Sequence, residues 1–343
     1  MSSSETNPPK LRTFLDLVDD CDSFPYVNAT SEYSSTAHLR TYYHLRVPAY
    51  PEVTLGYLLP SVALTLTNLS DWHLDPSDPS EYAPDSPNPQ TRTVTLITGN
   101  NEEERSAAIA KTCEAMRLTG HWKVLDKWRN ELYPVYGPNR ELLFKIERSA
   151  TPLFGVVTYG VHMTGYFYEG GKEEKDLRFW VPTRSQNKTY GGMLDNTVAG
   201  GMSAGEQPLE CLVRESEEEA SLPADFVRRN VKPVGAVTYF YIREPRAGGE
   251  TGLLQPECQY VYDLDMSEEK GVKCKPNDEE VEKFEIMNVD QIKEALGKAL
   301  FKPNCALVML DFLIRHGVCS KENEPNLAEI VSRLHRRLDF PLD

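Results

Sequence analysis

Four glutamates occupy positions 215 and 217 to 219 in a segment that is predicted to be helical. Like charges three or four residues apart repel on a helix by a few tenths of a kcal/mol per pair. At about 100° per residue, Glu215, Glu218 and Glu219 lie within roughly one third of the helix circumference, whereas Glu217 points elsewhere. Clustered carboxylates are hard oxygen ligands, which suit magnesium or manganese. We therefore expect these three to bind a divalent cation and Glu217 to lie on the surface.

A glycine turn and an apolar stripe hold this cluster in place. Gly200 and Gly201 precede the helix, and Pro208 suits its first turn, where a missing N–H costs nothing. The rest of the helix surface carries Leu209, Leu212, Val213 and Ala220. Because such a stripe docks on a sheet, the sequence predicts three carboxylates held at the edge of a packed helix.

The spacing of this segment also resembles a known pattern. Residues 200–222 follow G-x5-E-x7-R-E-U-x-E-E-x-G-U, in which U is apolar, at Gly200, Glu206, Arg214, Glu215, Glu218, Glu219 and Leu222. This pattern is the box that marks the Nudix hydrolases. Two positions differ from the pattern: Ser216 stands where the pattern has an apolar residue, and Ser221 stands where it has glycine. Ser221 must therefore end the helix without the freedom of glycine at positive φ.

The resemblance implies a reaction and a set of ligands. Nudix hydrolases cleave a nucleoside diphosphate linked to another moiety, or a related diphosphate. Water attacks phosphorus, and metal ions neutralise the charge on the phosphoryl oxygens. The implied ligands of Mg²⁺ or Mn²⁺ are Glu215, Glu218, Glu219 and the backbone of Gly201. Gly200 and an ion pair between Glu206 and Arg214 would support the site.

One glutamate must deprotonate the attacking water. Glu215 is the first candidate, and Glu218 completes the implied catalytic pair. Some relatives place the base outside the box, and the acidic segment 277–282 offers Glu280 and Glu282 as alternatives. A solvated acidic loop is the competing interpretation of that segment.

Composition limits the class of protein. The 343 residues carry a formal charge of −15 with a pI near 5.0, which argues against nucleic-acid binding and a basic membrane-surface role. No apolar run approaches the roughly 20 residues of a membrane span. Seven scattered cysteines without a C-x-x-C pair suit reduced thiols. Because neither a secretory signal nor an Arg-rich transit peptide is evident, we expect a cytoplasmic protein, with organelle import and oligomeric state left open.

The chain is long enough for two domains. We expect a smaller α+β companion domain at 1–148, with a Pro/Ser/Asp-rich loop at 75–90 and a helix from Glu102 to Leu118. Trp122, Leu125, Trp128 and Leu132 recur at helical spacing and predict a second helix. The Nudix domain is expected at 149–318 and a helical tail at 319–343.

The pattern after residue 152 favours an α/β fold. We expect strands at 154–162, 178–182, 197–199, 234–242 and 258–264, and helices ending at Leu296 and spanning 307–314. This order is compatible with the α/β/α sandwich around a mixed sheet that the Nudix resemblance implies.

A second resemblance covers nearly the whole chain. Runs at 180–185, 192–201, 253–257, 302–306 and 332–337 are similar to those of the thiamin pyrophosphokinase-related Nudix proteins of fungi and plants, which carry an N-terminal companion domain. That resemblance implies removal of the terminal phosphate from thiamin diphosphate analogues, with a preference for oxidised, damaged forms such as oxo- and oxythiamin diphosphate. The product would be the monophosphate, and the role would be clearance of damaged metabolites.

Residues outside the box suit such a ligand. Arg184 and Lys188, just before the glycine turn, could bind a diphosphate. Tyr239 and Tyr241 share one strand face and could stack on a flat ring, while Gln255 and Glu257 could recognise ring nitrogens. The alternative for each is an ordinary surface charge or a core position in a strand.

Other functions stay open at this point. A Nudix hydrolase could instead act on ADP-ribose, NADH or coenzyme A. Isopentenyl-diphosphate isomerase uses the same scaffold with a cysteine in proton transfer, but no trusted motif surrounds Cys211, Cys258 or Cys305. A non-catalytic nucleotide sensor usually lacks box glutamates, and all of them are present here.

Overall fold

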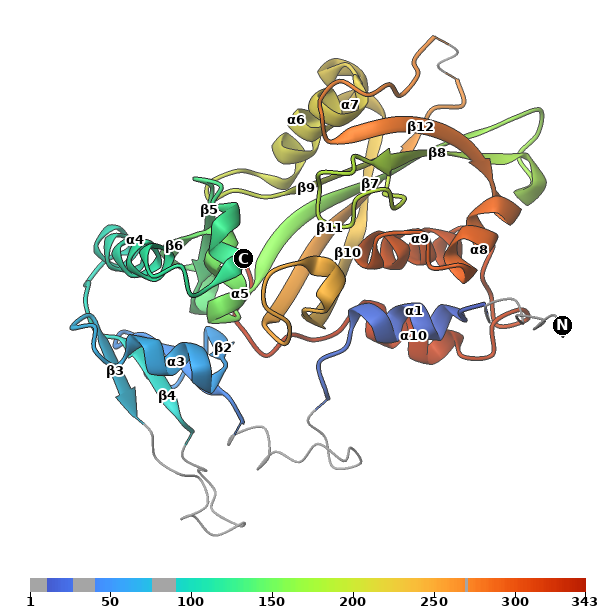
Figure 1. The fold of residues 1–343 in the computed structure, drawn as a ribbon. Coiled ribbons are helices and arrows are strands. Elements are labelled where there is room, and N and C mark those ends of the chain that lie inside the picture. The colour runs from blue at the N-terminus through green and yellow to red at the C-terminus, as the bar shows by residue number, and fades with distance from the viewer. Residues whose placement is uncertain (1–10, 27–40, 76–90, 269–270) are drawn as a thin grey trace, which may run out of the picture.

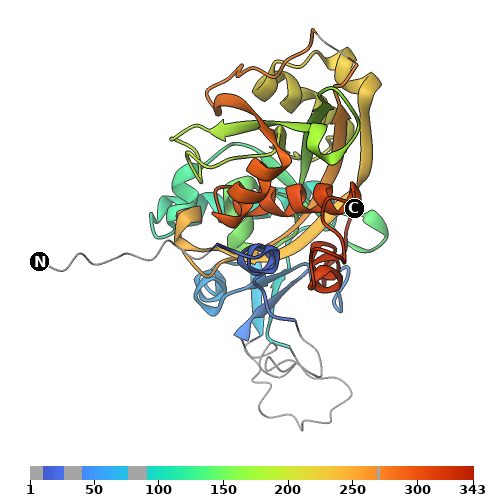
Figure 2. The same ribbon diagram turned by 90° about the vertical axis from the view of Figure 1, so that its right-hand side faces the viewer.

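The computed structural model describes residues 11–26, 41–75, 91–268 and 271–343. The expected Pro/Ser/Asp-rich loop therefore lies outside the described residues from position 76 onward. Figure 1 shows a smaller N-terminal lobe beside a larger lobe built around a long, twisted sheet, and Figure 2 shows helices packed beneath that sheet. Among the described residues, no helix is long and apolar enough to cross a membrane.

The N-terminal lobe is a small α+β unit. Its four-stranded sheet has the order β2-β1-β4-β3. A separate hairpin pairs β5 with β6. These elements are β1 (Tyr43–Arg46), β2 (Gly56–Leu58), α3 (Pro60–Leu66), β3 (Trp72–Asp75), β4 (Thr93–Leu96), α4 (Glu102–Leu118), β5 (Leu132–Tyr136) and β6 (Leu142–Glu147). The predicted helix from Glu102 to Leu118 is confirmed, with the Asn101 side chain capping its first turn.

The second helix predicted in this lobe is wrong. A short 3-10 helix spans Lys123–Lys127, and the chain then enters strand β5. Asn130 adopts a left-handed backbone with φ 57°, which a continuing helix does not allow. The aromatic and aliphatic spacing reflects core packing instead, because Trp122 and Leu125 are buried among the residues of this lobe.

The larger lobe contains a six-stranded mixed sheet. Its strand order is β10-β11-β7-β8-β12, and β9 pairs with β7. The β11–β7 pair is parallel, and the other pairs are antiparallel. The strands are β7 (Thr158–Tyr168), β8 (Leu177–Arg184), β9 (Val198–Gly201), β10 (Val231–Ile242), β11 (Leu254–Asp265) and β12 (Val281–Asn288). The expected strand at 154–162 starts late, because residues 151–154 form the helical turn α5 (Thr151–Phe154), which ends at left-handed Gly155.

Helices cover both faces of this sheet. One apolar core joins a sheet face to α6 (Pro208–Ala220) and α7 (Ala224–Asn230). A second core joins the other face to α1 (Phe14–Cys21), α8 (Val289–Gly297), α9 (Pro303–Arg315) and α10 (Leu327–Leu334). The expected α/β/α sandwich with a mixed sheet and a preceding α+β lobe is therefore confirmed.

Both ends of the described chain pack against the larger lobe, although we expected them to belong to a separate N-terminal domain and a separate C-terminal tail. Helix α1 lies against α9 and α10 of the larger lobe, and Figure 1 shows α1 beside α10. After α10 the tail is not helical, and Leu338 and Phe340 are buried in the core beneath α6. The domain boundaries at 148/149 and 318/319 stay predictions.

Candidate active site

The glycine turn and helix α6 form one wall of the site. Leu212, Val213 and Ala220 are buried as expected for an apolar stripe. Leu209 is not part of that stripe, because it lies in the first turn of the helix and is 36% exposed. Ser216 is fully buried and donates its hydroxyl to the carbonyl of Leu212 at 2.7 Å, so the polar side chain is satisfied.

The C-terminal end of α6 is strained where the box usually has glycine. Ser221 adopts φ 54° and ψ 29°, in the left-handed region. The N–H of Leu222 then donates to the carbonyl of Ser216 at 3.0 Å, which closes the helix end. Ser221 therefore adopts the left-handed conformation that usually favours glycine at the end of a helix.

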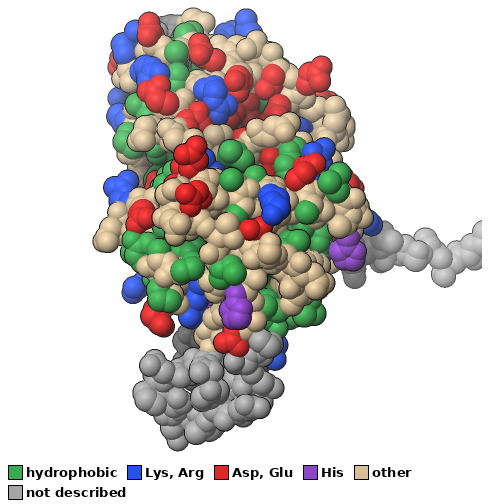
Figure 3. Space-filling model, turned by 90° about the vertical axis from the view of Figure 1, so that its left-hand side faces the viewer, with side chains coloured by type: hydrophobic (Ala, Val, Ile, Leu, Met, Phe, Trp, Pro, Cys, Tyr) green, Lys and Arg blue, Asp and Glu red, His purple; other side chains and the backbone are tan. Residues whose placement is uncertain are grey.

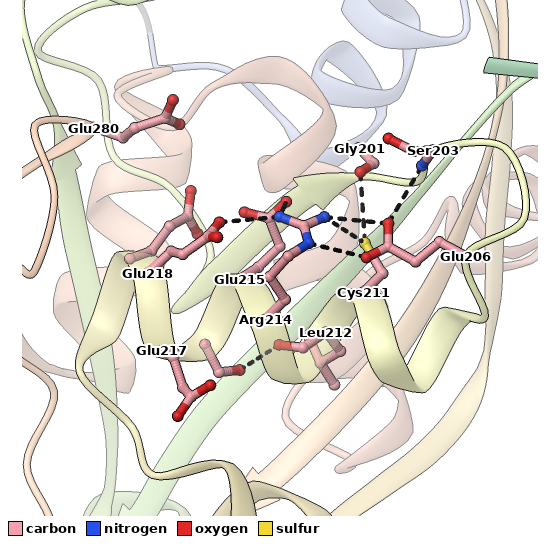
Figure 4. Close-up of polar contacts among 12 residues, drawn as sticks. Gly201, Ser203, Glu206, Cys211, Leu212, Arg214, Glu215, Glu217, Glu218 and Glu280 are labelled. Carbon is pink, nitrogen blue, oxygen red and sulfur yellow. Dashed lines mark hydrogen bonds and ion pairs between the residues drawn. The ribbon is translucent and has the colours of Figure 1, made fainter. Parts of the chain in front are cut away.

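Arg214 links the residues of the box. Its Nε and Nη2 donate to the two carboxylate oxygens of Glu206 at 2.9 and 3.2 Å. Its Nη1 donates to Glu215 at 2.8 Å and to Glu218 at 3.0 Å. Figure 4 shows the guanidinium between Glu206 on one side and the two helix carboxylates on the other. The pair of Glu206 and Arg214 thus ties the loop before α6 to the helix.

Glu215 is held in a restricted position. Its side chain is only 13% exposed, and burial raises its pKa to about 7, against the opposing effect of Arg214 and with a contribution from Glu218 and Glu280. A Cβ atom on Gly200 would lie 2.2 Å from the Glu215 Cδ. Only glycine at position 200 leaves room for this carboxyl group.

The other two glutamates differ in exposure. Glu219 is buried and accepts a hydrogen bond from the N–H of Ala199 at 2.9 Å. Burial, together with the charges of Asp195 and Glu215, raises the pKa of Glu219 well above its usual range. Glu218 is 52% exposed, and Glu217 is exposed as predicted.

A cation would relieve this crowding of carboxylates. Two of them have raised pKa values, and all offer the hard oxygen atoms that Mg²⁺ and Mn²⁺ prefer, so the donor set fits such an ion. Within the described residues, no three His, Cys, Asp or Glu side chains already stand in a metal-binding arrangement. In this structure Arg214 supplies the positive charge between Glu215 and Glu218.

The two alternative bases lie differently. Glu280, just before β12, reaches toward the box glutamates in Figure 4 and forms an ion pair with Lys188. Burial raises the pKa of Glu280, but Lys188 lowers it further, so the net shift is downward. Glu282 is exposed and does not line the cavity, because the sheet register shifts between Val281 and Lys283. We do not retain Glu282 as a candidate base.

The box residues line a cavity of about 840 Å³. Its lining includes Gly200, Gly201, Glu206, Arg214, Glu215, Glu218 and Glu280. Glu219 instead lines a small adjoining cavity with Asp195 and Arg184. Figure 3 shows acidic side chains gathered on the upper part of one face of the protein.

All six residues suggested as substrate contacts line the same cavity: Arg184, Lys188, Tyr239, Tyr241, Gln255 and Glu257. Two of them are already paired within the protein, since Arg184 contacts the buried carboxylate of Asp195 and Lys188 contacts Glu280. Tyr241 shares a hydrogen bond of 2.8 Å with Tyr190.

Glu257 is the centre of a buried polar group. Its carboxylate accepts hydrogen bonds from the Tyr239 hydroxyl at 2.5 Å and the Gln259 amide at 2.6 Å, and a third from Gln255. Nearby, His162 Nδ1 lies 2.7 Å from the Asn196 amide oxygen, and burial lowers its pKa to about 4. Apart from Asn196, these side chains line the same cavity from β7 and β11 and from the neighbouring strand β10, and Gln259 lies close to Gly200 of the box, since a Cβ atom on Gly160 would contact both.

Most of the polar lining was not predicted from the sequence. The N-terminal lobe contributes Lys123, Lys127, Arg129, Glu131, Tyr133 and Arg148, and the larger lobe adds His162, Tyr190, Arg243, Gln259, Lys302 and Asn304. Lys302 and Asn304 lie in a run that carried the second resemblance, which was a usable signal. For the N-terminal residues no local pattern exists, because only the packing of the two lobes brings them to the site.

The cysteines of the isomerase alternative do not reach the cavity. Cys211, Cys258 and Cys305 are buried, and none of them lines it. Cys21 does line it, but burial raises the pKa of its thiol well above the usual range.

Comparisons with known proteins identify two related domains and several similar chains. A NUDIX domain matches residues 165–305, and a domain of unknown function, DUF4743, matches residues 85–158. The chain is 41% identical over 244 residues to "Uncharacterized protein YJR142W" of Saccharomyces cerevisiae, across 70% of each chain.

Two plant proteins of Arabidopsis thaliana are also similar. "Nudix hydrolase 20, chloroplastic" is 37% identical over 68% of this chain and 59% of its own length. "Nudix hydrolase 24, chloroplastic" is 34% identical over 68% of this chain and 60% of its own length. The chain thus spans about three fifths of these two relatives. With all the glutamates of the box present on an α/β/α sandwich, the chain belongs to the Nudix hydrolase family, whose enzymes are pyrophosphohydrolases.

Proposed function

We propose that this protein hydrolyses oxidised or damaged thiamin diphosphate analogues, such as oxo- and oxythiamin diphosphate, to the monophosphate and inorganic phosphate. The observation that carries the proposal is a single cavity with two chemically different walls. One wall holds the box carboxylates, and the other holds the hydrogen-bonding group around Glu257. A diphosphate joined to a heterocycle has the matching two parts.

The metal ligands proposed are the carboxylates of Glu215, Glu218 and Glu219 and the carbonyl of Gly201. When bound there, Mg²⁺ or Mn²⁺ would neutralise charge on the phosphoryl oxygens and on the leaving group.

Glu215 is the proposed base. The oxygen of a water molecule forms a bond to the terminal phosphorus, and the bond from phosphorus to the bridging oxygen breaks. That oxygen leaves with the electron pair on the monophosphate, and the proton of the water passes to Glu215. A carboxylate with a pKa of about 7 accepts a proton more readily near neutral pH than Glu280, whose pKa is lowered.

The heterocycle would contact the wall around Glu257. The thiazolium ring of oxythiamin diphosphate is cationic, so the carboxylate of Glu257 offers it favourable electrostatics. The amides of Gln255 and Gln259 can donate hydrogen bonds or accept them, which suits a pyrimidine whose amino group has been replaced by an oxygen. These contacts support the proposed substrate class, and the resemblance in the flanking runs supports it independently.

We propose the cytoplasm as the location. All seven cysteines are free and buried, as expected in a reducing compartment. An organelle is the alternative, because two relatives are named as chloroplastic.

The test is a product analysis by chromatography in the presence of Mg²⁺. The substrates are thiamin diphosphate, its oxo and oxy analogues, ADP-ribose, NADH and coenzyme A. We expect inorganic phosphate and a monophosphate from the oxidised thiamin compounds at the highest kcat/KM. If ADP-ribose or NADH is cleaved better than every thiamin compound, the substrate assignment fails and the hydrolase assignment stands.

A matched set of variants tests the metal ligands. Glu219→Gln and Glu218→Gln should lose most activity, whereas Glu217→Gln, an exposed neighbour on the same helix, should keep it. Unchanged hydrolysis by the first two variants would show that the metal site is wrongly assigned. Isopentenyl diphosphate serves as a further substrate: formation of its allyl isomer without phosphate release would favour the isomerase.

A further inference from the structure

The hairpin β5–β6 of the N-terminal lobe docks on the loop of the Nudix box. The N–H of Ala204 donates to the carbonyl of Leu132 at 2.8 Å, and the Ser203 hydroxyl donates to Glu131 at 3.1 Å. A Cβ atom on Gly201 would lie only 1.7 Å from the hydroxyl oxygen of Tyr133. The loop that precedes α6 is therefore built in contact with the other lobe.

Arg148 follows β6 and reaches the same place. Its Nη1 donates to Glu131 at 2.9 Å, and its Cζ lies 5.4 Å from the centre of the Tyr133 ring. The same Cζ is 3.3 Å from the position of a Cβ on Gly201. This guanidinium therefore lies beside the loop that carries the proposed metal ligand, Gly201.

The charge of Arg148 interacts with the carboxylates of Glu215 in the box and Glu280 outside it. Burial lowers the pKa of the guanidinium, but the charges of Glu131 and Glu215, among others, raise it further. Arg148 in turn lowers the pKa of Glu280. Arg148 thus lies near both carboxylates at the end of the cavity where hydrolysis would occur.

Three other cations at this end are paired with carboxylates, while the exposed Arg129 also lines the cavity. Arg184 is paired with Asp195, Lys188 with Glu280, and Arg214 with three glutamates. Arg148 has one ion-pair partner, Glu131, which also binds Ser203. Its side chain is 40% exposed, and its Nε and Nη2 form no hydrogen bond with any residue in the described part of the chain. Two donors are therefore left for a ligand in the cavity.

The lining of the cavity is less acidic than the chain as a whole. Nine lysine and arginine side chains line it against seven carboxylates, although the chain carries a formal charge of −15. Four of these cations come from the N-terminal lobe, and Arg148 is the one in contact with the box loop.

We propose that Arg148 binds the diphosphate of the substrate, so that the N-terminal lobe completes the active site of the Nudix domain. The Nε and Nη2 of Arg148 donate to non-bridging phosphoryl oxygens, because a guanidinium matches two such oxygens in one plane. This inference rests on hydrolysis of a diphosphate and is independent of whether thiamin is the other half of the substrate.

The test compares Arg148→Met and Arg148→Lys with a matched control. Arg228 on α7 is also 40% exposed and paired with one glutamate, Glu210, but it does not line the cavity. Arg148→Met keeps an apolar stem against Tyr133 and removes the charge. Binding of inorganic diphosphate is measured by calorimetry with a chelator present, and kcat and KM are measured with the best substrate of the screen.

We expect Arg148→Met to weaken diphosphate binding and to lower kcat/KM by about 10- to 100-fold, the range for a lost charged hydrogen bond. Arg148→Lys should retain part of both, and Arg228→Met should stay within about twofold of the unmodified protein by the same reasoning. An unchanged diphosphate affinity in Arg148→Met, whatever its melting temperature, would overturn the proposal and leave a packing role only. Failure of the thiamin assignment would not alter the calorimetric result, so the two proposals fail separately.

Discussion

Replacement of Gly200 by alanine should displace the proposed base without unfolding the protein. The new Cβ would lie 2.2 Å from Cδ and 2.3 Å from Cγ and Oε1 of Glu215, where ordinary contacts begin at 3.4 Å. The Glu215 carboxyl must therefore move by about 1 Å, and a misplacement of that size costs about 10²-fold in rate, or about 2.7 kcal/mol of transition-state stabilisation. Stability should change less than activity, because the atoms that must move belong to a side chain and not to the backbone.

The assay measures kcat/KM by phosphate release, beside the free energy of unfolding from urea titration. Gly271→Ala is the control, since a Cβ there meets no atom of the described residues within 4 Å. The reasoning is refuted if Gly200→Ala keeps more than about one third of the original kcat/KM, or if its activity falls only in proportion to lost folded protein.

Three further changes test other parts of the structure. Ser221→Gly should stabilise the protein by about 0.5 kcal/mol in urea titration, because release from the left-handed backbone outweighs the lost hydrogen bond to Lys275; a loss of stability would contradict this account. In the folded protein the pKa of His162 is about 4, whereas its ordinary value is 6.5. Between these pH values the unfolded chain therefore binds more protons than the folded one. About 3 kcal/mol of the free energy of unfolding should be lost as the pH falls from 6.5 to 4. His162→Gln should flatten that slope, and an equally steep slope in the variant would assign it to other groups. Glu257→Gln should raise KM for the heterocyclic substrate about tenfold while leaving the affinity for inorganic diphosphate unchanged, whereas an equal effect on both would remove Glu257 from ring recognition.

The residues of the box could be predicted because their geometry is local. Helical periodicity alone separates Glu215, Glu218 and Glu219 from Glu217, and the structure has Glu217 exposed. The turn at Ser221 was also foreseeable, since the helix must end there with or without glycine. The role of each glutamate in binding a metal stays a prediction.

Residue spacing gave wrong predictions where the backbone is not a continuous helix or a regular strand. Trp122 and Leu125 recur at helical spacing because both face one core, yet Asn130 interrupts the backbone. Glu280 and Glu282 were alternative bases in one acidic segment, but only Glu280 lines the cavity, because the sheet register shifts between Val281 and Lys283. In both places the backbone conformation, which residue types alone do not determine, decides where the side chains lie.

The net charge of the chain gives a misleading picture of its cavity. A formal charge of −15 argues against anionic partners as a whole, and it describes the field at a distance. The cavity holds more cations than carboxylates because separate segments, at 123–148, 184–188, 214, 243 and 302, converge there. In the proposed function the box breaks the diphosphate bond, whereas these converging cations and the side chains around Glu257 bind the substrate. The lining of the cavity depends on lobe packing, which no spacing within a single segment encodes.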